Sequence, residues 1–193
     1  TNSVMYALKK FGIEETDRTK LYKFIGPPLT ESFEKFYGFT KEQSLDGVKY
    51  YREYYHDKGI YENRVYDGLE EVLKKINEAG KQAIVATSKP EKYAKIIIDH
   101  FHLTQYFACV AGMEMDGGRG TKAQVITYAL EKNDITDKSN VLMIGDREHD
   151  VIGAHENGLD CLGILYGFGS RKEFEEAGAD YIRENVEDIL QFV

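Results

Sequence analysis

Asp146 and Asp150 lie four residues apart, directly after the apolar run 141–144. Two carboxylates at this spacing, the first at the tip of a strand, suit a hard divalent cation such as Mg²⁺. Asp is also a favoured first residue of helices, so Asp150 can instead cap a helix that begins near Val151. His149 has no second His at metal-ligand spacing, which disfavours zinc. The residues alone leave the Mg²⁺ site and the helix cap open.

Thr87 and Ser88 follow another apolar run, 83–86, and precede a helix that begins near Pro90. A hydroxyl beside the free N–H groups of a helix N-terminus forms a phosphate-binding corner, although a simple helix cap has the same residue types. Lys122 ends the glycine-rich stretch 117–122, which lacks the Gly-Lys-Ser/Thr end of a P-loop and so excludes a nucleotide P-loop. Lys122 is then a phosphate ligand or a solvated charge in the first turn of a helix.

The elements that must position these side chains alternate between strands and helices from Asp67 onward. The predicted strands are 83–86, 107–111, 141–144, 161–165 and 181–182. Continuous apolar strands between amphipathic helices predict an α/β fold, a Rossmann-like doubly wound parallel sheet with both faces covered. Ligands bind at the carboxyl ends of such strands, which is where Thr87, Lys122 and Asp146 lie.

The first part of the chain has helix signals and no convincing strand. Thr40 and Gln43 form a capping box ahead of a Tyr-rich helix, and further helices are expected at 4–11, 21–25 and 29–36. We therefore expect a small helical domain over 1–66 and the α/β core over 67–193. In the helical domain, Pro27, Pro28 and Arg52 are candidate substrate-selecting residues, although an Arg on a Tyr-rich helix is more often a surface charge.

Composition narrows the class of protein. The chain has 193 residues and a formal net charge of −8, which argues against nucleic acid or an anionic membrane as partner. No apolar run approaches the ~20 residues of a membrane-spanning helix. Cys109 and Cys161 form no disulfide framework. We expect a soluble cytoplasmic protein.

The order of these motifs resembles the haloacid dehalogenase superfamily, in its phosphoglycolate-phosphatase-like branch. The matching stretches are VATSKP (85–90), Lys122 at its helix start, IGDREHDVIGA (144–154), GILYGFGS (163–170), AGADY (177–181) and IGPPL (25–29). The resemblance covers nearly the whole chain and implies that the helical domain is a cap on a Rossmann-like core.

The resemblance also implies a reaction, the Mg²⁺-dependent hydrolysis of a small-molecule phosphate monoester through an aspartyl-phosphate. Thr87, with Ser88 beside it, would bind the phosphoryl oxygens, and Lys122 would neutralise the charge that the nucleophile and the phosphate share. Asp146 would ligate Mg²⁺, with Asp150 supporting the ion directly or through water. The cap would exclude water and select the leaving group.

The chain departs from the family in one respect. The first family motif, Asp-x-Asp-Gly-Thr, supplies the nucleophile and is absent from the printed sequence. In the family it lies on the central strand, between the strands that end at Thr87 and Asp146. Without that strand the sheet would have a gap of about 10 Å, two ladder spacings. We expect that the printed sequence is truncated just before Thr1 and that it is inactive by itself.

Two other functions are compatible with the same residues. One is a non-catalytic phosphate- or metal-binding protein of this fold, and the other is a phosphomutase. Phosphoglycolate, pyrophosphate and nucleoside monophosphates are all candidate ligands. The expected partner is a small phosphorylated metabolite, and the sequence leaves the oligomeric state open.

Overall fold

The computed structural model describes residues 1–114 and 118–193, so the first glycine of the stretch 117–122 lies outside the described residues. The chain divides into two compact units, Thr1–Arg64 and Val65–Val193. The sequence-based boundary lies after residue 66. No helix in the described parts of the chain is long and apolar enough to cross a membrane.

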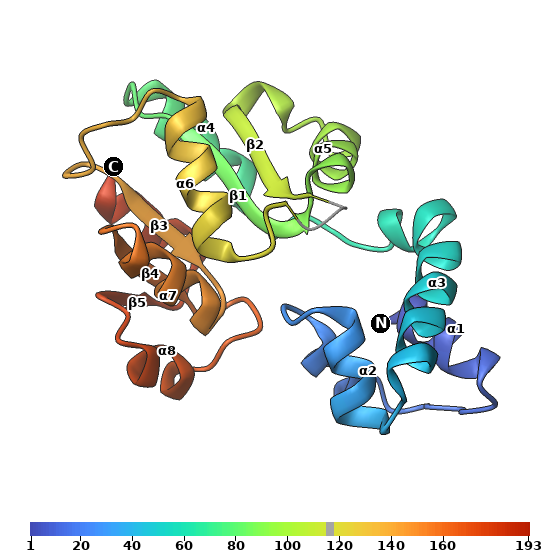
Figure 1. The fold of residues 1–193 in the computed structure, drawn as a ribbon. Coiled ribbons are helices and arrows are strands. Elements are labelled where there is room, and N and C mark those ends of the chain that lie inside the picture. Colours follow the sequence, from blue (N-terminus) through green and yellow to red (C-terminus); the bar gives the residue numbers. More distant parts are fainter. Residues whose placement is uncertain (115–117) are drawn as a thin grey trace. The chain divides into compact units, whose positions relative to one another are not determined.

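The first unit is entirely helical (Figure 1). It consists of α1 (Asn2–Lys10), the 3-10 helix η1 (Arg18–Phe24), α2 (Leu29–Tyr37), α3 (Lys41–Asp57) and the short η2 (Gly59–Tyr61). Helices α1 and α2 both pack against α3. The expected capping box is confirmed, because Gln43 N donates to Thr40 Oγ1 and Thr40 N donates to Gln43 Oε1. The helix expected at 21–25 is a 3-10 helix and begins earlier, where the Asp17 carboxylate accepts from Thr19 N.

An aromatic core holds the first unit together. Its buried residues are Val4, Ala7, Leu8, Leu21, Phe24, Phe33 and Phe39. Phe33 stacks on Phe39 at a centroid distance of 5.5 Å, and Phe24 meets Phe33 edge-on at 5.2 Å. Ring pairs of this kind add to the burial of apolar area. Phe24, Phe33 and Phe39 are therefore core residues of the first unit.

The second unit alternates strands and helices, as expected. Its elements are α4 (Leu69–Glu78), β1 (Ala83–Pro90), α5 (Glu91–His100), η3 (Thr104–Tyr106), β2 (Phe107–Met113), α6 (Lys122–Lys132), β3 (Leu142–Gly145), α7 (Glu148–Glu156), β4 (Asp160–Ile164), α8 (Arg171–Ala177), β5 (Tyr181–Arg183) and η4 (Val186–Phe192). All paired strands are parallel. The α/β fold class is thus confirmed.

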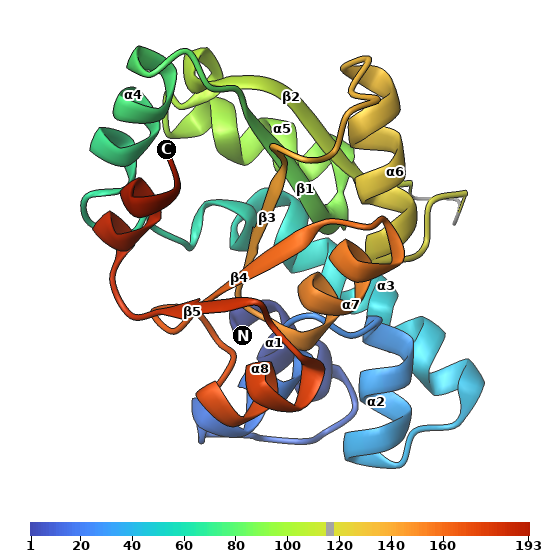
Figure 2. The same cartoon turned by 90° about the vertical axis from the view of Figure 1, so that its left-hand side faces the viewer.

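Both faces of the larger sheet are covered (Figure 2). Successive residues of β4 enter different cores: Cys161 packs with α6, α7 and α8, whereas Leu162 packs with α4 and η4. In β3, Met143 packs in the same core as Cys161, and Ile144 packs in the same core as Leu162. Side chains of a strand point alternately to the two faces, so a strand buried on both faces is apolar throughout. This explains the continuous apolar runs in the sequence.

The strands form two separate sheets. One has the order β1-β2 and the other the order β3-β4-β5. Among the described residues, β1 is paired only with β2, and β3 only with β4. The interrupted sheet agrees with the expectation of a gap between the strand that carries Thr87 and the strand that leads to Asp146.

Candidate active site

A cavity lies between the two sheets, and its lining is apolar along β1, β3 and α6 but includes polar residues such as Lys81 and Asp137. Its volume is about 350 Å³, and it is lined by Ile84 and Ala86 of β1, by Leu142 and Met143 of β3, and by residues of α6. The residues of α6 that line it are Ile126, Ala129 and Leu130. Within residues 1–114 and 118–193, each strand beside it has one edge without a strand partner. An unpaired strand edge can form hydrogen bonds with a further strand. The edges of β1 and β3 that border this cavity are therefore able to pair with a strand placed between them.

Lys122 lies beside the middle of β1. The capping box of Thr121 and Gln124 begins α6 at this residue. Lys122 Nζ donates to Ala86 O at 2.9 Å and lies 2.7 Å from Asp150 Oδ1. The Lys122 side chain is only 11% exposed. The structure therefore excludes the interpretation of Lys122 as a solvated charge.

Gly153 lets Lys122 lie against α7. A Cβ on Gly153 would come within 2.7 Å of Lys122 Cγ. Asn157, four residues further along the same segment, donates to Ala123 O at 3.0 Å and accepts from Thr127 Oγ1 at 2.8 Å. The N-terminal half of α6 and the C-terminal half of α7 are thus held together by direct contacts.

Asp150 is buried and uses both carboxylate oxygens. Oδ2 accepts from Asp146 N at 2.9 Å and Arg147 N at 3.1 Å, while Oδ1 pairs with Lys122. Helix α7 begins at Glu148, which corrects the expected start near Val151. The reason is that Asp150 lies within the first turn of α7, and its side chain binds the amides of the two residues that precede the helix. In this arrangement its oxygens are already occupied by protein donors.

Asp146 follows β3 and faces a glycine-flanked loop. Phe168 N donates to Asp146 Oδ2 at 3.0 Å. A Cβ on Gly167 would overlap the Asp146 side chain, and one on Gly169 would overlap its main-chain oxygen. Burial raises the pKa of Asp146, and the nearby charge of the Asp150 carboxylate raises it too. The hydrogen bond from Phe168 N lowers this pKa, but its effect is smaller than that of burial. Sequence reasoning did not single out Phe168, although the two glycines beside it were a signal of close approach.

Asp146 fits a role as one ligand of Mg²⁺. A cation beside this carboxylate would offset the burial and like-charge effects that raise its pKa. Within the described ranges, no group of three His, Cys, Asp or Glu side chains is arranged to hold a metal ion. Mg²⁺ usually keeps several waters and binds one or two carboxylates together with substrate phosphate oxygens. One carboxylate from Asp146 is compatible with that pattern.

Thr87 and Ser88 lie inside β1, not beyond its end, because the strand extends to Pro90. The ladder with β2 shifts register between Thr87 and Pro90, so the chain is irregular at these residues. Thr87 Oγ1 accepts from Lys89 N at 3.1 Å. Ala86, the residue before Thr87, binds Lys122. The structure thus brings Thr87, Lys122, Asp146 and Asp150 to one end of the second unit.

The three candidate substrate-selecting residues belong to the first unit. Pro28 is the N-cap of α2, and Pro27 precedes it in the turn after η1. Arg52 is an exposed residue of α3.

Known proteins are similar to this chain in sequence and in structure. The family model of haloacid dehalogenase-like hydrolases matches residues 1–164. A 5'-nucleotidase of Pseudomonas aeruginosa is 43% identical over 173 residues, which cover 90% of this chain and 78% of that protein. The tyrosine-protein kinase PtkA of Mycobacterium tuberculosis is 32% identical over 169 residues, 87% of this chain and 57% of the kinase.

A solved structure of a predicted phosphatase is also similar to this chain. The crystal structure of a predicted phosphatase from Clostridium acetobutylicum has a TM-score of 0.92 and 45% identity, and the match covers 98% of this chain and 88% of that one. The resemblance inferred from the motifs is thus confirmed. The chain belongs to the haloacid dehalogenase-like hydrolases.

Proposed function

We propose that this protein is a Mg²⁺-dependent phosphatase that hydrolyses small-molecule phosphate monoesters, with nucleoside 5'-monophosphates as the first substrates to test. The position of Lys122 Nζ carries the proposal, because it lies between Ala86 O at 2.9 Å and Asp150 Oδ1 at 2.7 Å. A buried ammonium beside Ala86, the residue before Thr87, is suited to neutralise a phosphoryl group. The relatives at 43% and 45% identity bear the names of a 5'-nucleotidase and a phosphatase, which favours hydrolysis over phosphomutase transfer.

The reaction requires a nucleophile beside Lys122. We expect it to be an Asp at the carboxyl end of a strand that occupies the cavity between β1 and β3. Its carboxylate attacks phosphorus, and the ester oxygen leaves as an alcohol after it takes up a proton. Water then hydrolyses the aspartyl-phosphate and releases inorganic phosphate, which regenerates the carboxylate.

The chain's own residues would bind and orient the phosphoryl group. The Thr87 hydroxyl and the amides near Ser88 would donate to its oxygens, while Lys122 would stabilise the negative charge that develops in the transition state. Asp146 would hold Mg²⁺, which supplies charge neutralisation when bound. Asp150 would orient Lys122, and it would reach the ion only through water while both of its oxygens are bound as seen here.

The first unit would select the leaving group as a cap. Pro27, Pro28 and Arg52 are the residues that we assign to this role from the family resemblance. A guanidinium at Arg52 would suit a substrate with a second anionic group. Phosphoglycolate is such a substrate and belongs in the same panel as the nucleotides.

The experiment is phosphate release from a panel of monoesters by protein expressed from its complete coding sequence. We expect Mg²⁺-dependent turnover that is lost with a chelator and restored by excess Mg²⁺. Lys122→Met and Asp146→Asn should each lower kcat/KM about a hundredfold or more. Arg171→Gln, which removes an exposed ion pair with Glu184, is the matched control and should retain activity.

The outcomes separate the alternatives. Absence of hydrolysis across the panel, with phosphate binding retained, would overturn the proposal in favour of a non-catalytic binding protein. Appearance of an isomeric phosphate ester without inorganic phosphate would instead identify a phosphomutase.

A further inference from the structure

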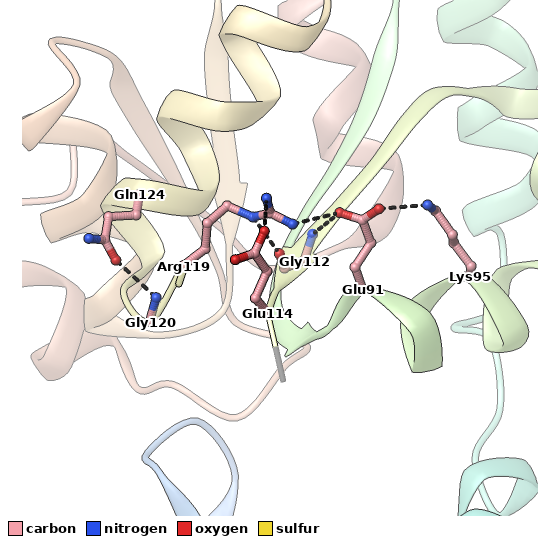
Figure 3. Close-up of polar contacts among 7 residues, drawn as sticks. All are labelled: Glu91, Lys95, Gly112, Glu114, Arg119, Gly120 and Gln124. Atoms are coloured by element: carbon pink, nitrogen blue, oxygen red, sulfur yellow. Dashed lines mark hydrogen bonds and ion pairs between the residues drawn. The ribbon is translucent and has the colours of Figure 1, made fainter. Parts of the chain in front are cut away.

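Arg119 joins three elements of the second unit (Figure 3). Its Nε donates to Gly112 O at 3.2 Å, its Nη2 lies 3.2 Å from Glu91 Oε2, and its Nη1 lies 2.5 Å from Glu114 Oε1. The guanidinium carbon is also 3.8 Å from the ring centroid of Tyr128 in α6. These contacts link the carboxyl end of β2, the first residue of α5 and the surface of α6.

Glu91 is the partner that connects Arg119 to β1. It follows Pro90, the last residue of β1, and begins α5. Glu91 Oε1 is 2.6 Å from Lys95 Nζ, and Oε2 also accepts from Gly112 N at 3.4 Å. Burial opposes ionisation of Glu91, but the hydrogen bonds and charges of Lys95 and Gly112 N outweigh it, so its pKa is lowered.

Gly112 allows this close approach. A Cβ at Gly112 would lie 2.6 Å from Glu91 N and 2.6 Å from Lys89 O. Gly112 is also the ladder partner of Thr87. Arg119 therefore binds the β2 residue that lies directly opposite Thr87 in the β1–β2 ladder.

Arg119 also lies close to the start of α6 in the sequence, because only Gly120 and Thr121 separate it from Lys122. Gly120 N and Thr121 N both donate to Gln124 Oε1, at 2.9 and 3.1 Å. Lys122 is the first residue of α6 and the third after Arg119. The short segment from Arg119 to Lys122 is thus fixed by the guanidinium at one end and by the capping box at the other.

We propose that Arg119 and Glu91 are positioning residues that set the location of Lys122 Nζ beside Ala86 of β1. This role rests on the proposed phosphatase function of Lys122. Without the Arg119–Glu91 contact, the segment before α6 keeps its cap but loses its attachment to the β1–α5 junction. The hydrogen bond from Lys122 Nζ to Ala86 O is then no longer held at a fixed length.

The chemistry requires Arg rather than Lys. A guanidinium is planar and donates in several directions at once, so it can bind Gly112 O and Glu91 together while it lies over Tyr128. An ammonium at the same place is a single point charge. The partners are partly buried, with both Arg119 and Glu91 side chains below one-fifth exposed, so water replaces the contact poorly.

The first experiment measures the position of Lys122 directly, by the rate at which an amine-acylating reagent modifies its Nζ in the full-length protein. Mass spectrometry after digestion follows Lys122 and Lys138, whose Nζ donates to Asn157 O at 2.8 Å. We expect Arg119→Lys and Arg119→Gln to raise the rate at Lys122 several-fold and to leave Lys138 unchanged. Arg171→Gln should alter neither.

Glu91→Gln and the double variant Arg119→Gln/Glu91→Gln complete a cycle. Because Glu91 acts on Lys122 through Arg119, the double variant should not exceed Arg119→Gln in its effect on the Lys122 rate. An unchanged Lys122 rate in both Arg119 variants would overturn the proposal. A parallel rise at Lys138 would also overturn it, since that result indicates general loosening.

The second experiment is kinetic and uses the most active ester of the panel. A displacement of about 1 Å costs up to a hundredfold in rate, so we expect Arg119→Lys to lower kcat about ten- to hundredfold with a smaller change in KM. Labelling reports on Lys122 even where no ester is hydrolysed. A failure of the phosphatase function is therefore distinguishable from a failure of the positioning role.

Discussion

Lys122 Nζ and Asp150 Oδ1 are 2.7 Å apart, and the two side chains are 11% and 8% exposed. This buried ion pair joins the first turn of α6 to the first turn of α7. It also connects the two sheets, because Lys122 binds Ala86 of β1 while Asp150 binds the amides that follow β3. The pair is therefore a structural link as well as the centre of the proposed site.

Removal of Lys122 should destabilise the fold. In Lys122→Met the Asp150 carboxylate stays buried without its cation, and breaking such a pair costs about 3–5 kcal/mol. Urea unfolding should show a lower midpoint at unchanged slope. Lys172→Met removes an ion pair whose side chains are 82% and 69% exposed and should change the unfolding free energy by less than about 0.5 kcal/mol. Equal stability of the two variants would contradict this prediction.

Gly145 should tolerate no side chain. A Cβ at Gly145 would overlap the Asp150 carboxylate, so Gly145→Ala should displace Asp150 at a cost of about 3 kcal/mol. Gly158→Ala is the matched control, because Gly158 has a φ of +70° and open space around it. It should cost about 1 kcal/mol for the backbone conformation alone. Thermal unfolding of both variants measures the difference, and a smaller loss for Gly145→Ala than for Gly158→Ala would refute the prediction.

Glu173 should make stability depend on acid pH. Burial opposes its ionisation, but hydrogen bonds from Arg147 Nε and Glu148 N, both at 2.8 Å, outweigh burial and lower its pKa below the usual 4.5. A lowered folded pKa adds stability that is complete above pH 4.5 and is lost as the pH falls through the folded value.

Melting temperatures between about pH 6 and pH 3 test this dependence. The wild type should lose stability more steeply below pH 4.5 than Glu173→Gln. Glu176→Gln, at a position whose side chain is 69% exposed, is the control and should follow the wild type. Identical slopes for the wild type and Glu173→Gln would argue against the predicted role.

The Cys161 thiol should be inert in the folded protein. Burial, together with the charges of Asp150 and Asp180, raises its pKa to about 12. Because the thiolate is the reactive species, a chromogenic disulfide reagent at about pH 8 should react with Cys161 only as fast as the protein unfolds. Reaction in the native state at the rate of a free thiol would disprove this, and Cys161→Ser identifies the signal.

The sequence by itself determined the local structure of this protein. Continuous apolar runs predicted the bodies of all five strands, since such runs are buried on both faces of a parallel sheet. The capping box at Thr40 was readable because its hydrogen bonds lie within four residues. The family could be named from the order of Thr87, Lys122, Asp146 and Asp150 along the chain.

Only the tertiary structure decided which side chains meet. The sequence left Asp150 open between a metal ligand and a helix cap, and the structure instead occupies its oxygens with Lys122 and two amides. Arg119 and Glu91 are 28 residues apart, and no local pattern linked them. Phe168 N meets Asp146 across 22 residues. These contacts depend on how strands and helices pack, and packing is a property of the whole core rather than of any short segment.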